Sequence, residues 1–332
     1  MELRTKVDIE PSPTKITYND PVIFIGSCFA SSIGSQMEMG RMPVLINPAG
    51  AVYNPVSVCN TLDTITSGRR FTKDDLCFYN GTWLSFFHYT DFSSDDPLKV
   101  VDKINKKSYE ALEFFKNARF LFITLGTARV YRLKKSGMIV SNCHRMPSDQ
   151  FESELLTVSD IVTILTKQLD RLHTLFPHLK VVFTISPVRH WKDGAHGNQV
   201  SKSALFLAVE ELLRYQFPPQ YFPAYELVID DLRDYRFYNE DMLHPSPMAI
   251  NYIWEAFSGC YMENKTMNIR NEVVKITKAC QHRINTDSPS KIKEFAERML
   301  TQIADIESKV PSIDFTFERN YFRTLEKTGS GK

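Results

Sequence analysis

The sequence lacks the features that define several protein classes. Its six cysteines are sparse among 332 residues and none forms a C-x-x-C pair, so we expect neither a disulfide framework nor a metal site. No apolar run reaches the roughly 18 residues of a membrane-spanning helix, and the polar start of the chain has no apolar segment typical of a signal peptide. The 40 Lys+Arg nearly balance the 39 Asp+Glu, so the chain lacks the excess of basic residues that is typical of a general nucleic-acid binder. We therefore expect a cytoplasmic protein without a membrane or nucleic-acid partner.

The composition is ordinary for a globular protein, with 43% apolar and 24% charged residues. Aromatic residues reach 12%, which predicts a large core or a stacking surface for a ligand. A chain of 332 residues is expected to form one large domain with an appendage, or two domains.

Short apolar runs alternate with segments of helical periodicity. The expected strands are residues 21–25, 42–46, 119–125, 179–185 and 225–229. The expected helices are residues 31–39, 101–118, 157–176, 201–215 and 247–257. Thr157 and Asp160 at the start of the third helix resemble a capping box. This alternation predicts an α/β fold with a mostly parallel sheet and helices on both of its faces.

The pattern changes near residue 262. Apolar residues then recur every three or four positions, which predicts helices over 265–284 and 289–308, the second with Ser288 as N-cap and Pro289 in its first turn. We expect a main domain over residues 1–262 and a C-terminal helical extension over 263–332. The extension would pack on the main domain or form a homodimer.

Two short motifs carry candidate chemistry. The first follows the strand 21–25 and reads Gly26-Ser27-Cys28, where a nucleophile would lie beside the free N–H groups of a helix start. In the second, Asp241 precedes His244 by three residues, so that a carboxylate can orient an imidazole acting as general base. Because ligands bind at the carboxyl ends of parallel strands, both motifs are expected at one edge of the sheet.

Together these motifs resemble the SGNH (GDSL-type) ester hydrolases, in which a nucleophile follows the first strand and D-x-x-H follows the last. The stretch Gly26-Ser27-Cys28-Phe29-Ala30 also spells the motif of the GSCFA family, which is SGNH-like. Further similar stretches are Asn47-Pro48-Ala49-Gly50, Tyr53-Asn54-Pro55, Leu125-Gly126-Thr127-Ala128, Asn142-Cys143-His144, Ser186-Pro187-Val188-Arg189-His190 and Asp241-Met242-Leu243-His244-Pro245. The resemblance spans roughly residues 20–262. It implies a three-layer α/β/α domain of the SGNH-hydrolase, flavodoxin-like type.

The resemblance implies catalytic roles residue by residue. Aligning Gly26 with the family's first glycine places Cys28, rather than the usual serine, at the nucleophile, and Ser27 is the alternative. A cysteine at a helix N-terminus beside His244 is expected to have a pKa below about 8.5. Asp241 and His244 match the last block unchanged.

The resemblance also implies an oxyanion hole made by the backbone N–H of Cys28, by Gly50 and by Thr127. The block at Gly126-Thr127-Ala128 lacks the asparagine that normally donates to the oxyanion. Six further residues are expected to line the substrate pocket: Gly126, Arg189, His190, His144, Trp83 and His88.

The leading hypothesis is a hydrolase of a small-molecule or carbohydrate ester, plausibly an O-acetyl group on a sugar, that acts through a covalent acyl-enzyme and needs no cofactor. One alternative is acyl transfer by the same residues. Another is an SGNH-like protein that binds its ligand without turnover or with weak turnover, which the missing asparagine favours.

Overall fold

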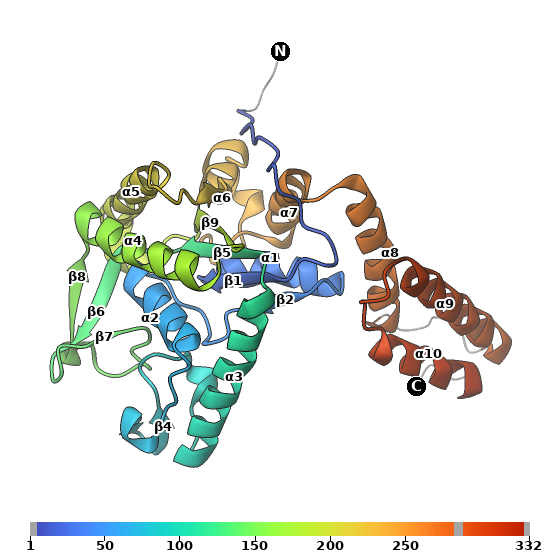
Figure 1. Ribbon diagram of the computed structural model, residues 1–332, viewed down its shortest axis with the longest axis horizontal. Helices are drawn as coiled ribbons and strands as arrows, with labels where there is room; N and C mark the ends of the chain where they lie inside the picture. Colours follow the sequence, from blue (N-terminus) through green and yellow to red (C-terminus); the bar gives the residue numbers. More distant parts are fainter. Residues whose placement is uncertain (1–4, 282–287, 329–332) are drawn as a thin grey trace. The chain divides into compact units, whose positions relative to one another are not determined.

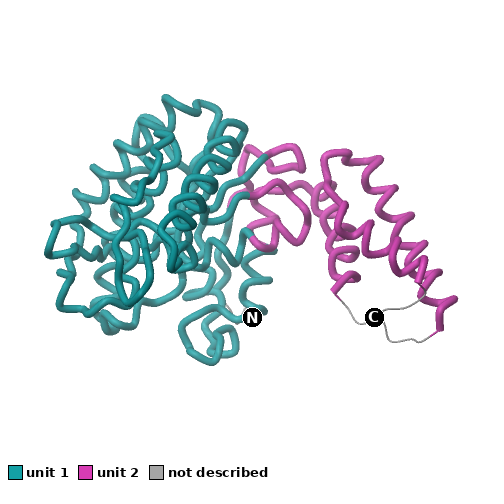
Figure 2. Tube along the Cα trace, turned by 90° about the horizontal axis from the view of Figure 1, so that it is seen from below, with its two compact units in different colours: residues 1–9, 21–34, 45–255 teal, residues 10–20, 35–44, 256–332 magenta. Residues whose placement is uncertain are grey.

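The computed structural model describes residues 5–281 and 288–328. The chain divides into two compact units, which Figure 2 colours separately. The first unit comprises residues 1–9, 21–34 and 45–255, and the second comprises residues 10–20, 35–44 and 256–332. The second unit therefore contains the C-terminal helices together with residues 10–20 and 35–44 from the N-terminal part of the chain.

A five-stranded sheet with helices on its faces forms the centre of the first unit (Figure 1). Its strand order is β10-β9-β5-β1-β2. The strands are β1 (Val22–Gly26), β2 (Val44–Ile46), β5 (Phe120–Leu125), β9 (Lys180–Ile185) and β10 (Gln220–Tyr221). The parallel pairing confirms the predicted α/β fold.

The central strands are apolar and buried along their length. All five residues of β1 and all six of β5 are buried, as is typical of parallel strands covered on both faces. Ile25 pairs with Ile123, which in turn pairs with Phe183, so the three strands end at the same edge. The turns after β1, β5 and β9 therefore start from one edge of the sheet.

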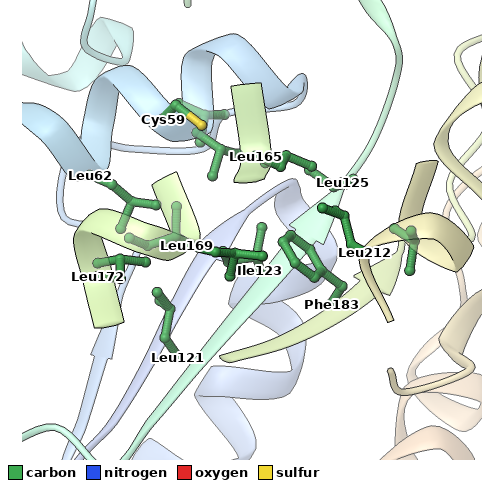
Figure 3. Packing of buried hydrophobic residues seen from close by; sticks show 14 of the residues in the cluster. Cys59, Leu62, Leu121, Ile123, Leu125, Leu165, Leu169, Leu172, Phe183 and Leu212 are labelled. Carbon is green, nitrogen blue, oxygen red and sulfur yellow. The ribbon is translucent and has the colours of Figure 1, made fainter. Parts of the chain in front are cut away.

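The helices of the first unit bury their apolar sides against this sheet and against one another. They are α2 (Pro55–Thr66), α3 (Pro97–Asn117), α4 (Val158–Leu175) and α5 (Gly194–Leu212). The residues of α1 (Cys28–Met39) and α7 (Pro247–Tyr261) are divided between the two units. Figure 3 shows Leu165 and Leu169 of α4 among the strand residues Ile123 and Phe183. The predicted capping box of α4 is present: the Thr157 hydroxyl accepts from the Asp160 N–H, and the Asp160 carboxylate accepts from the Thr157 N–H. Removing this apolar area from water is the main term that stabilises the unit.

The prediction of a strand over residues 225–229 is wrong. The segment forms the short helix α6 (Ala224–Glu226) and a π-helical turn, η5 (Leu227–Asp231). Its apolar residues are buried at helical rather than alternating spacing, and a short apolar run does not distinguish the two cases. The edge strand is instead β10, just before this segment.

Several short elements were not predicted. They are the antiparallel sheet of β6 (Arg129–Leu133), β7 (Ile139–Val140) and β8 (Phe151–Leu155), the hairpin of β3 (Cys77–Tyr79) and β4 (Thr82–Leu84), and the 3-10 turns η1 (Lys73–Asp75), η2 (Thr90–Phe92), η3 (Ser148–Gln150), η4 (Trp191–Asp193) and η6 (Tyr235–Phe237). Helix α2 was also missed, although Asn54 caps it by accepting from the Ser57 N–H at 2.8 Å.

The C-terminal part of the second unit holds three helices that pack on one another. They are α8 (Asn264–Gln281), α9 (Pro289–Lys309) and α10 (Thr316–Thr328). Both predicted helices are confirmed within the described residues, and 282–284 lie outside them. Helix α10 was not predicted; its buried Glu318 forms an ion pair with Arg41 of the same unit. In the stretches 5–281 and 288–328, no helix combines the length and hydropathy needed to cross a membrane.

We predict that Gly26→Ala strongly destabilises the first unit. Gly26 has φ +143°, and a Cβ atom there would lie 2.2 Å from the Thr124 carbonyl oxygen of the neighbouring strand. The backbone at this position cannot move without breaking the β1–β5 pairing, so the free energy of unfolding should fall by about 3 kcal/mol or more in a urea titration.

The matched control is Gly259→Ala in α7, where a Cβ atom would meet nothing within 4 Å. Its effect should be neutral or stabilising by up to about 1 kcal/mol. Equal stability of the two variants would contradict the role of Gly26.

Candidate active site

The turn between β1 and α1 holds the first motif in a fixed position. The Gly26 N–H donates to the Asn47 side-chain oxygen at 2.8 Å, and the Gly26 carbonyl accepts from the Val52 N–H at 2.9 Å. Ser27 is 1% exposed, and within the described residues its hydroxyl has no hydrogen-bond partner. The Ser27 hydroxyl is therefore shielded from solvent in this turn.

Cys28 is the first residue of α1 and is only partly buried. Burial raises the pKa of its thiol above the ordinary value. The N–H groups of Phe29 and Cys28 and the charge of Lys202 oppose this rise in pKa, and the charge of Asp241 adds to it. The prediction of a lowered pKa is therefore wrong: desolvation outweighs the helix N-terminus. Cys28 is a thiol at rest and needs a base in order to attack.

Lys202 of α5 lies wholly inside the protein, with 0% of its surface exposed. Its ammonium donates to the carbonyl oxygens of Gly126 and Ser186, each at 2.6 Å. These residues directly follow β5 and β9, so one cation joins the ends of the two strands. Burial lowers the pKa of Lys202 to about 7, the charge of Cys28 raises it and that of Arg189 lowers it.

Asp241 and His244 form a hydrogen-bonded pair in the loop before α7. His244 Nδ1 lies 2.5 Å from Asp241 Oδ2, and Asp241 Oδ1 accepts from the N–H groups of Leu243 and His244, each at 2.9 Å. The N–H groups of His244 and Leu243, followed by the His244 ring, lower the pKa of Asp241 to about 2. An imidazole that donates Nδ1–H to this carboxylate keeps the lone pair of Nε2 available, as a general base requires.

His190 follows β9 and contacts Tyr53 and Gly126. Its ring meets Tyr53 edge-on at 5.6 Å, and a Cβ atom on Gly126 would lie 3.4 Å from its Nε2. Burial lowers its pKa to about 4, helped by the charges of Lys202 and His244 and then of Lys192. His190 is thus neutral near pH 7. The predicted residues Cys28, Gly126, Arg189, His190, Asp241 and His244 are all linked to this neighbourhood by such contacts and charge interactions.

The structure places the groups of the two additional oxyanion candidates, Gly50 and Thr127, in other hydrogen bonds. The Gly50 N–H donates to the Asn47 carbonyl at 2.7 Å. The Thr127 hydroxyl bonds to Ser201 at 2.9 Å and accepts from the Arg129 N–H at 3.0 Å. The N–H groups at the start of α1, including that of Cys28, remain as candidate donors.

Three other predicted pocket residues lie in a separate aromatic cluster. His88 is 3% exposed and bonds through Nδ1 to the Ser85 hydroxyl at 2.9 Å, while His144 Nε2 bonds to the Ser85 carbonyl at 2.9 Å. Trp83 packs on Phe78, with ring centroids 5.1 Å apart. None of the contacts described for these three side chains, in residues 5–281 and 288–328, reaches Cys28, His190 or His244.

A cleft of about 560 Å³ adjoins the Asp241–His244 pair. Arg189 and Asp241 both line it. No group of three or more His, Cys, Asp and Glu side chains in the described parts of the chain is arranged to hold a metal ion.

The fold and this geometry define an α/β protein with a thiol, a carboxylate-oriented imidazole and a buried ammonium near one edge of its sheet. A sequence profile of the GSCFA family matches residues 21–257, and the chain belongs to that family. No curated protein matches the chain.

Lys202 is the main residue that the sequence analysis missed. It lies three residues before Leu205 and seven before Val209, in phase with the buried stripe of α5. The sequence signal for a buried Lys202 is therefore its position on the helix face where the apolar residues recur.

We predict a pH-dependent stability difference between the protein and its Lys202→Met variant. Unfolded lysine keeps its proton up to its ordinary pKa of 10.5, whereas folded Lys202 loses it near pH 7. Between these values the unfolded state binds more protons, so raising the pH stabilises the wild-type fold. The unfolding free energy of the wild type should gain up to about 1.4 kcal/mol per pH unit relative to the variant.

Urea titrations at pH 7, 8 and 9 measure this difference. The carbonyl groups left without a donor in the variant lower its stability equally at every pH, so only the slope reports the titration of Lys202. Parallel stability curves would contradict a lowered pKa.

Proposed function

We propose that this protein is an SGNH-like hydrolase that cleaves an ester through a thioester on Cys28. The observation that carries the proposal is the 2.5 Å contact between His244 Nδ1 and Asp241, whose charge also acts on Cys28. A carboxylate-oriented imidazole near a partly exposed thiol is the arrangement that nucleophilic acyl transfer needs. An O-acetyl group on a carbohydrate is the substrate class that the family resemblance favours.

In the acylation step His244 Nε2 removes the thiol proton of Cys28, and the sulfur attacks the acyl carbon. The N–H groups at the start of α1 stabilise the oxyanion that forms. His244 then returns the proton to the departing alcohol. Asp241 stabilises the imidazolium throughout, and its low pKa keeps it ionised.

In the deacylation step His244 removes a proton from water, which attacks the thioester. The acid leaves, and Cys28 regains its proton. An alcohol in place of this water would make the same residues an acyltransferase.

A ligand-binding protein with little or no turnover is the second candidate. The raised pKa of Cys28 and the engaged groups of Gly50 and Thr127 favour it. Among the described residues no hydrogen bond joins Cys28 to His244, so catalysis requires the two groups to approach when substrate binds.

We predict that the hydrolysis of 4-nitrophenyl acetate depends on Cys28 and His244. Cys28→Ala should abolish turnover and Cys28→Ser should retain part of it. His244→Ala should lower kcat about 100-fold or more, because it removes the general base. Release of 4-nitrophenolate measures each rate.

Two variants serve as controls. Ser27→Ala should keep most of the activity, since this hydroxyl is buried. His178→Ala removes an exposed histidine between α4 and β9 and should leave the rate unchanged. Full activity in both Cys28→Ala and His244→Ala would refute the proposed mechanism, and a wild-type protein that does not hydrolyse the ester would leave the binding function.

A further inference from the structure

The cleft beside Asp241 has features that esterase chemistry does not require. It is lined by residues from the segment after β9, from η5 and η6, and from the loop before α7: Arg189, Trp191, Val228, Ile229, Arg233, Asp234, Tyr235, Tyr238, Asp241, Met242 and Leu243. Its volume of about 560 Å³ is typical of sites for small organic ligands.

Aromatic rings are unusually exposed around this cleft. Trp191 is 55% exposed and Tyr235 is 76% exposed, and the rings of Tyr235 and Tyr238 lie 6.1 Å apart. Such rings have an apolar face and a polar edge. They therefore suit a ligand with apolar and polar surfaces, such as a sugar ring with its C–H faces and hydroxyl groups.

The carboxylates of the cleft are already paired. Asp234 bonds to Arg236 at 2.8 Å and Asp241 bonds to His244. Arg233, a cation of the same cleft, pairs with Asp230 at 3.0 Å.

Arg189 differs from these charged residues. Within the described residues no ion pair joins it to a carboxylate, and its charge acts on the phenols of Tyr225 and Tyr238 and on Lys202. The cationic side chains of Arg189 and the buried Lys202 therefore act on one another. A guanidinium that is not paired with a carboxylate of the protein is suited to bind a carboxylate or phosphate of a ligand.

We propose that this cleft binds a sugar ring carrying a carboxylate or a phosphate, with the anion on Arg189 and the ring against Trp191 and Tyr235. The inference rests on the proposed function, because it takes this sugar to be the alcohol part of the ester that the enzyme cleaves. The cleft adjoins Asp241, so a bound sugar would present its acyl group towards His244. The enzyme would thus select acylated acidic sugars over neutral ones.

Binding can be tested without turnover by calorimetric titration of the full chain with glucuronic acid, glucose 6-phosphate and glucose. At least one acidic sugar should bind about 10-fold or more tightly than glucose, as one charged hydrogen-bonded contact implies. Glucuronic acid and glucose 6-phosphate distinguish a carboxylate from a phosphate ligand. Equal binding of all three sugars, or no binding, would overturn the proposal.

Two variants separate the two contacts. Arg189→Gln should remove the preference for the acidic sugar, whereas Arg214→Gln, which changes an exposed arginine in the turn after α5, should keep it. Trp191→Ala changes an exposed residue. It should lower the affinity for every sugar about 10-fold and leave the affinity for inorganic phosphate unchanged. Unchanged sugar binding in Trp191→Ala would contradict the stacking contact even if Arg189→Gln did not fold.

The test of the sugar subsite and the test of the ester hydrolase can fail independently. Acidic-sugar binding without cleavage of 4-nitrophenyl acetate would keep the subsite and reject the hydrolase. Cleavage without any preference for acidic sugars would keep the hydrolase and reject the subsite.

Discussion

The buried ammonium of Lys202 is the interaction on which the candidate site depends. It joins the carbonyl groups that follow β5 and β9, and its charge acts on the thiol that follows β1. Three neighbouring parallel strands thus end around one cation. Burying an ammonium without acceptors is strongly unfavourable, so the two carbonyl groups that accept from Lys202 must come together as the core forms.

This cation also bears on the choice of nucleophile. Desolvation raises the pKa of Cys28, while Lys202 and the N–H groups at the start of α1 lower it. A serine hydroxyl in the same place would hold its proton far more tightly than a thiol does. Cysteine therefore fits a site whose Gly50 and Thr127 groups are engaged elsewhere, because a thiolate is formed and attacks more readily.

Much of the fold was predictable because β1, β5 and β9 are continuous apolar runs ended by turn residues, and α4 carries both a stripe and a capping box. The prediction of a strand over 225–229 failed because the apolar residues of this short segment fit the period of a strand as well as that of a helix. The pair Asp241–His244 was readable from local spacing alone. The role of Lys202 was not, since its acceptors lie 76 and 16 residues away and meet it only in the folded sheet. The engaged state of Gly50 and Thr127 likewise depends on partners that only the fold brings close.

The central claim is that Cys28 forms a covalent acyl intermediate. Its most direct test is to quench the reaction with 4-nitrophenyl acetate in acid during the first turnover and to map the acetyl group by peptide mass spectrometry. The account predicts one acetyl group on Cys28, held as a thioester that neutral hydroxylamine releases. Steady turnover with no acyl group on Cys28, or with the acetyl group on Ser27, would contradict it.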